Sequence, residues 1–160
     1  MSLAPRGRLV AVEIDPQSLS PVRSFIDEER AVAVRDLVAD NTFVPAAAPP
    51  AEAFRLRLSL SEGRLVLDVT SEEHEPVVRH VLSLTPLRRV VKDYFLVCEA
   101  YYAARHGSAP VQIEAIDVGR RGLHNEGAEI LRERLSGKIA VDFPTARRLF
   151  TLVCSLHWKG

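Results

Sequence analysis

The sequence of 160 residues contains only two cysteines, Cys98 and Cys154, and neither has further cysteines at metal-ligand spacing. Both lie in apolar helical patterns, so we expect two buried thiols without a disulfide and no metal site. The segment from Met1 to Arg8 lacks the apolar stretch of a secretory signal. Together these features predict a cytoplasmic protein, because free thiols are typical of a reducing compartment.

An excess of charge of one sign is also missing, since 21 basic and 21 acidic side chains give a formal charge of zero. Proteins that coat nucleic acid or a membrane surface usually carry a strong basic excess. No apolar run reaches the roughly 20 residues needed to span a bilayer, so no membrane contact is expected.

Sequence signatures of common enzyme classes are absent as well. The chain has no Gly-rich nucleotide loop, no nucleophile elbow, no H-E-x-x-H and no catalytic carboxylate pair at a recognisable spacing. We therefore expect no cofactor and no metal ion.

Alternating apolar residues predict an antiparallel sheet of about three to four strands. Phe54–Leu60 and Arg64–Val69 alternate on either side of a short loop that contains Gly63, which is typical of a hairpin. Val77–Leu84 continues the meander, with one face apolar and the other partly charged. Arg8–Asp15 and Lys138–Asp142 are predicted as two further strands.

Helical periodicity predicts about four to five helices packed as a layer on this sheet. The segment Pro86–Arg105 is apolar around most of its circumference, so we expect a central helix that is covered on several sides. The other predicted helices are Phe25–Asn41, Pro110–Val118, Leu123–Leu135 and Pro144–His157. The fold class is thus α+β, as a single domain over residues 1–160, with a Pro/Ala-rich surface loop at residues 45–53.

The densest polar cluster is the segment Asp117–Gly127, which lies between two predicted helices. Its three glycines favour a tight corner, and Asn125 is placed to cap the following helix. Free backbone N–H groups beside Arg120 and Arg121 would suit a phosphate or a carboxylate. We therefore predict a ligand-binding corner formed by Arg120, Arg121, His124, Asn125 and Glu126.

An alternative interpretation is a helix–helix corner without a ligand, in which the arginines pair with Asp117, Glu126 and Glu129. A second basic group, Arg88, Arg89 and Lys92, is another candidate for binding anions, although an Arg89–Asp93 pair would explain part of it. Arg147–Arg148 is a third basic pair. The sequence leaves open whether these groups converge.

Two classes of function follow from this corner. The first is a binding or adaptor module for an anionic small molecule, an RNA segment or a protein partner. The second is a hydrolase of the phosphoesterase or ribonuclease type, in which His124 is the general acid/base. A purely structural subunit that uses an open sheet face or edge is a third hypothesis, and a homodimer is consistent with any of them.

Three segments carry a family resemblance: Leu82–Tyr102, Ile113–Leu135 and Val141–Trp158. They resemble the uncharacterised protein family 0262 of the UPF series, which occurs in alphaproteobacteria, and the hairpin is similar too. The Pro-rich segment and the N-terminus match poorly. The resemblance implies a small cytoplasmic bacterial protein and assigns no catalytic residue.

Overall fold

The computed structural model describes residues 7–19, 24–46 and 53–156, and it has an α+β fold of four helices and two sheets within these ranges. The larger sheet has the strand order β1-β3-β4-β5. Its strands are β1 (Arg8–Ile14), β3 (Ala53–Ser61), β4 (Arg64–Ser71) and β5 (Pro76–Ser83). The predicted hairpin and meander are confirmed, since β3, β4 and β5 pair antiparallel. The β1 strand instead pairs parallel with β3, so the sheet is mixed.

The two faces of this sheet differ as expected from the alternation. Leu56, Leu58 and Leu67 are about 1–2% exposed and contribute to the core. On the opposite face, Glu13, Arg57, Asp68 and Arg79 lie in register across the four strands. Glu13 and Arg57 form an ion pair of 2.9 Å, and Asp68 and Arg79 form one of 3.8 Å. The outer face is therefore a row of alternating charges.

A second sheet of two antiparallel strands pairs β2 (Phe43–Pro45) with β6 (Ile139–Val141). The β6 strand was predicted from the sequence, whereas its partner β2 was not. Pro45, the first residue of the predicted surface loop, belongs to β2, and Ala53, the last one, begins β3. The middle of that loop, residues 47–52, lies outside the described residues.

The four helices are α1 (Ser24–Ala39), α2 (Arg88–Ala104), α3 (Pro110–Leu135) and α4 (Phe143–Cys154). Short 3-10 turns precede α1 and α2, at Pro16–Ser18 and Thr85–Leu87. Asp142 caps α4, because its carboxylate accepts a hydrogen bond of 2.9 Å from the Thr145 amide. The predicted end of this last helix at His157 lies outside the described residues, and α4 itself ends at Cys154.

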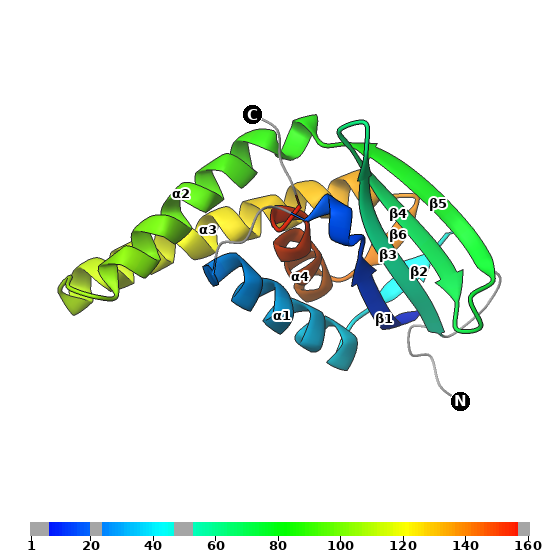
Figure 1. Ribbon diagram of the computed structural model, residues 1–160, viewed down its shortest axis with the longest axis horizontal. Coiled ribbons are helices and arrows are strands. Elements are labelled where there is room, and N and C mark those ends of the chain that lie inside the picture. The colour runs from blue at the N-terminus through cyan, green and yellow to red at the C-terminus, as the bar shows by residue number, and fades with distance from the viewer. Residues whose placement is uncertain (1–6, 20–23, 47–52, 157–160) are drawn as a thin grey trace.

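The most enclosed helix is α4 rather than α2. Phe150 and Leu152 on α4 are fully buried, and α4 lies between the sheet and the other helices (Figure 1). By contrast, Leu96 on α2 is 58% exposed. The prediction that Pro86–Arg105 forms a helix is correct, but its expected place at the centre is wrong. Its apolar circumference is only partly covered, mainly by α3.

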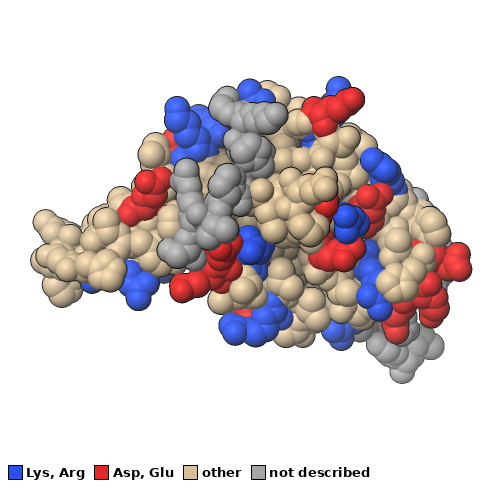
Figure 2. Space-filling model, in the orientation of Figure 1, with Lys and Arg blue, Asp and Glu red and all other residues tan. Residues whose placement is uncertain are grey.

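Helices α2 and α3 form an antiparallel pair whose outer part extends beyond the rest of the molecule (Figure 1). We call this outer part the arm and define it as residues 96–122. The end of the arm shows few charged side chains in the space-filling view (Figure 2). The described residues contain no helix that is both long enough and apolar enough to cross a membrane.

The predicted corner at Asp117–Gly127 does not exist, because these residues lie within the continuous helix α3. Neither the predicted helix end at Val118 nor the new start near Leu123 is present. Ion pairs from Asp117 to Arg120 and Arg121, three and four residues later, follow the helical repeat through the glycines. Gly127 is enclosed by packing, since a Cβ atom there would lie 2.2 Å from the Phe150 ring. At this position glycine therefore allows α3 and α4 to pack closely, and it does not form a turn.

Candidate functional site

A cleft of ≈ 510 Å³ lies between α1, α3 and α4, with two tyrosines of α2 at its side. We call it the α1–α4 cleft. Its basic lining residues come from two places in the sequence, Arg120 and Arg121 on α3 and Arg147 and Arg148 on α4. Two of the three basic groups seen in the sequence therefore converge. Acidic residues of α1 line the opposite wall: Glu28, Glu29 and Asp36.

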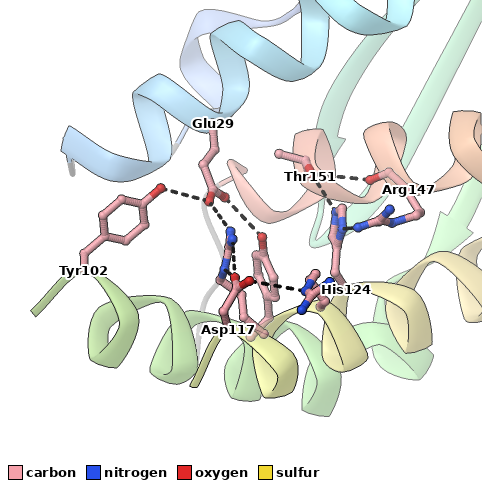
Figure 3. A network of polar contacts seen from close by, with 9 residues as sticks. Glu29, Tyr102, Asp117, His124, Arg147 and Thr151 are labelled. Atoms are coloured by element: carbon pink, nitrogen blue, oxygen red, sulfur yellow. Dashed lines mark hydrogen bonds and ion pairs between the residues drawn. The ribbon is translucent and has the colours of Figure 1, made fainter. Parts of the chain in front are cut away.

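Glu29 is the centre of a polar network on this wall (Figure 3). Its carboxylate accepts hydrogen bonds of 3.2 Å from the hydroxyls of both Tyr94 and Tyr102. Arg120 donates a third, of 3.3 Å, through Nη1. Burial and the charge of Glu29 raise the pKa of Tyr102 to about 12, so its hydroxyl remains a donor well into alkaline pH. The network joins α1, α2 and α3.

Arg120 is held on every side by other groups of the protein. It contacts Asp117 at 2.6 Å and Glu29 at 3.3 Å, and its guanidinium lies 4.3 Å from the centroid of the Tyr101 ring. Arg121 differs, since its one ion pair among the described residues joins Nε to Asp117 at 3.3 Å, and its side chain is 58% exposed. The neighbouring arginines therefore have different roles, with Arg120 structural and Arg121 accessible.

His124 lies deep in the same cleft and is packed between aromatic rings. Its ring stacks on Tyr94 at a centroid distance of 5.4 Å and contacts Phe150 at 5.6 Å. Its Nε2 atom lies 2.8 Å from Thr151 Oγ1, and Arg147 donates to Nδ1 from Nε at 3.2 Å (Figure 3). Because an arginine N–H can only donate, Nδ1 is the acceptor and Nε2 carries the proton.

Burial and the adjacent Arg147 lower the pKa of His124 to about 4, so the imidazole is neutral at pH 7. The Thr151 hydroxyl in turn donates to the Arg147 carbonyl at 3.3 Å. Both ring nitrogens are thus engaged within the protein. An acid/base role for His124, as the sequence suggested, would require the Arg147 contact to break first.

The remaining predicted site residues lie away from the cleft. Asn125 is exposed in the middle of α3 and caps no helix. Glu126 forms an ion pair with Arg89, which also pairs with Asp93 at 3.1 Å as expected from its spacing. Arg88 and Lys92 are exposed on α2. The group Arg88, Arg89 and Lys92 therefore does not join the other basic pairs.

Several cleft residues had no clear signal in the sequence. Glu29 was not singled out from the sequence, and only the fold reveals its three partners. Thr151 was not singled out either. Arg147 and Arg148 were recognisable as a basic pair, but their meeting with α3 depends on the packing of α4. The described residues contain no group of three potential metal ligands.

The sequence profile of one family, described as "Uncharacterised protein family (UPF0262)", matches residues 6–159. The chain belongs to this family. A UPF0262 protein of Xanthobacter autotrophicus is 58% identical over 156 residues, which cover 98% of this chain and 95% of the relative. UPF0262 proteins of Azorhizobium caulinodans and Brucella canis are 56% and 55% identical, and each match covers 98% of this chain and 97% of the relative. No solved structure matches the chain.

Proposed function

We propose that the protein is a binding module that holds a small anionic ligand, of the phosphate or carboxylate class, in the α1–α4 cleft. The observation that carries this proposal is the convergence of Arg121 from α3 with Arg147 and Arg148 from α4 on one cavity of ≈ 510 Å³. Guanidinium groups suit such ligands because their planar N–H groups match the oxygens of phosphates and carboxylates.

The arginines of α4 keep donors available for a ligand. Arg147 contacts His124 through Nε and Nη2, and Arg148 donates through Nη1 to the Asp40 carbonyl at 2.9 Å. Since a guanidinium has five N–H donors, these contacts leave several on each side chain. In this proposal His124 and Thr151 hold Arg147 in place, and the neutral imidazole does not repel its guanidinium.

The charge of the opposite wall favours a small ligand over RNA. Glu28, Glu29 and Asp36 line the cleft on α1 and would repel a long polyanion that extends across it. A compact anion held between Arg121 and the two arginines of α4 stays on the basic side of the cleft and avoids this repulsion. The neutral charge of the whole chain supports the same choice.

Calorimetric titration with inorganic phosphate, citrate and adenosine monophosphate tests the proposal. We expect at least one of them to bind, with affinity that falls as salt is raised. The double variant Arg147→Gln/Arg148→Gln should weaken binding by more than about tenfold, because each charge-assisted hydrogen bond contributes roughly 1.5–3 kcal/mol. The matched control is Arg88→Gln, an exposed arginine outside the cleft, which should bind as the wild type does.

Absence of binding by all three anions at millimolar concentration, or equal affinity of the double variant and the wild type, would contradict the proposal. The hydrolase hypothesis is distinguished in the same samples. It requires turnover of a phosphodiester such as bis-p-nitrophenyl phosphate that is lost in His124→Gln, whereas the binding proposal expects no turnover in either protein.

A further inference from the structure

The arm exposes several apolar side chains. Val111 and Val118 on α3 are 79% and 57% exposed, and Leu96 on α2 is 58% exposed. Ala115 and Gly122 are exposed as well. Soluble proteins tolerate single exposed valines, but a continuous apolar row on one helix is typical of an interaction surface.

The row on α3 has the spacing of a helix–helix seam. Val111, Ala115, Val118 and Gly122 follow one another at steps of four, three and four residues, which is the repeat of residues that face a partner helix. The row lies on the side of α3 opposite to Arg120 and His124, which point into the molecule. A Cβ atom at Gly122 would meet no atom within 4 Å, so this position leaves open space beside the backbone. Small residues in such a row let a second helix approach closely.

We propose that a second copy of this chain packs on this row, with the two α3 helices antiparallel. The charges beside the row support this choice of occupant. Glu114 and Arg121 are both exposed and lie seven residues apart on the same flank of the row, the flank that borders the α1–α4 cleft, where Arg121 also pairs with Asp117 through Nε. When Ala115 lies level with Val118 of the partner subunit, Glu114 lies within two residues, about 3 Å along the helix axis, of the partner's Arg121 on the same flank. The two-fold symmetry repeats this pair, so one seam gains two ion pairs.

The shape of the molecule permits this arrangement. The arm extends away from the sheet and α4 (Figure 1), so antiparallel pairing places each body beyond the end of the other arm. A parallel pair would instead bring both bodies to the same end. The seam from Val111 to Gly122 is only about 17 Å long at 1.5 Å per residue. The surface area that it buries is therefore smaller than that of a standard interface. We therefore expect a dimer that forms at micromolar concentration.

Variants that reverse the charge of Glu114 or Arg121 test the proposal, with the monomer–dimer equilibrium measured by sedimentation velocity at several concentrations. Glu114→Arg places Arg opposite Arg twice, and Arg121→Glu places Glu opposite Glu twice, so each variant alone should dissociate at least tenfold more readily than the wild type. An equimolar mixture of the two variants restores both Glu–Arg pairs and should form a heterodimer. Circular dichroism of each variant verifies that it remains folded.

A second pair of variants separates this face from others. Val118→Glu should abolish the dimer, whereas Val81→Glu, at an exposed valine of β5, should leave it unchanged. A wild type that stays monomeric at several hundred micromolar would overturn the proposal. So would a dimer that survives Val118→Glu, or a mixture of the charge variants that sediments like its components.

Discussion

The two halves of α3 have the same backbone conformation but different surroundings. In the inner half, Gly127, Ala128, Leu131 and Leu135 are buried, and the helix packs on α4. In the outer half, no residue from Pro110 to Gly122 is fully buried, and two valines are largely exposed. The comparison shows that one continuous helix is stabilised by packing in the core at one end and mainly by contacts with a single helix, α2, at the other.

The junction of the two halves is where the polar network lies. Arg120 and His124 are the last residues of α3 to face the cleft before the helix enters the core. Their partners come from α1 and α4, so the cleft exists only because the inner half is fixed. Disturbing the packing of the inner half should therefore affect stability strongly, and the same change in the outer half should not.

The largest expected effect is the loss of the aromatic ring beneath the inner half. Tyr94 is 4% exposed, stacks on His124 and lies edge-on to Phe150 at 5.7 Å. Tyr94→Ala should lower the free energy of unfolding by about 3–5 kcal/mol, as truncation of large buried aromatics does. Leu96→Ala, two residues away on the exposed side of α2, should cost less than about 1 kcal/mol. Urea unfolding of both variants measures the contrast, and equal losses would contradict it.

Acid should weaken the inner half through His124. Burial and Arg147 lower its folded-state pKa to about 4, below the ordinary value of 6.5. The folded state therefore binds fewer protons than the unfolded state. The contribution of neutral His124 to the free energy of unfolding is complete above about pH 6.5 and is lost as the pH falls towards 4. The loss amounts to about 3 kcal/mol. In urea unfolding between pH 7 and pH 4, His124→Gln should show a correspondingly smaller decline than the wild type, and parallel curves would refute this assignment.

The smallest expected effects come from adding one methyl group to each half. Gly127→Ala forces a Cβ atom against the Phe150 ring at 2.2 Å, and we expect a net loss of about 2 kcal/mol even after the better helix propensity of alanine. Gly122→Ala meets no atom of its own chain, so at concentrations where the protein is monomeric it should instead stabilise the fold by up to about 1 kcal/mol. Thermal unfolding of the two variants compares the signs. A stabilising Gly127→Ala would mean that the inner half is loosely packed.

Local periodicity was sufficient to predict most of the elements. The strands of the meander and the segments of α1, α2 and α4 follow from the spacing of their apolar residues, which is a property of adjacent sequence. The buried, unbridged state of Cys98 and Cys154 was also expected and is confirmed. Long-range pairing was not predictable in this way. The partner of β6 is a three-residue strand almost a hundred residues earlier, and the neighbour of β1 lies beyond α1.

The candidate site was predicted less well, because glycine has two uses that look alike in a sequence. The three glycines near Arg120 favoured a corner with free N–H groups, yet all three lie inside α3. Only the Phe150 ring reveals that Gly127 is needed for packing, and that ring is 23 residues away. Arg120, Arg121 and His124 all line the α1–α4 cleft, whereas Glu29 and Thr151 come from helices whose approach depends on the whole fold.

The parallel pairing of β1 with β3 has a consequence for the order in which the chain folds. The pairs β3–β4 and β4–β5 join neighbouring segments, so they need only short loops to close. The β1–β3 pair brings Leu9 beside Phe54, and the chain between them includes α1 and β2. Closing this long loop costs more chain entropy than closing a hairpin. We therefore expect the meander to form early, as a template on which the N-terminal strand docks late, and amide protons of β1 to become protected from exchange after those of β4.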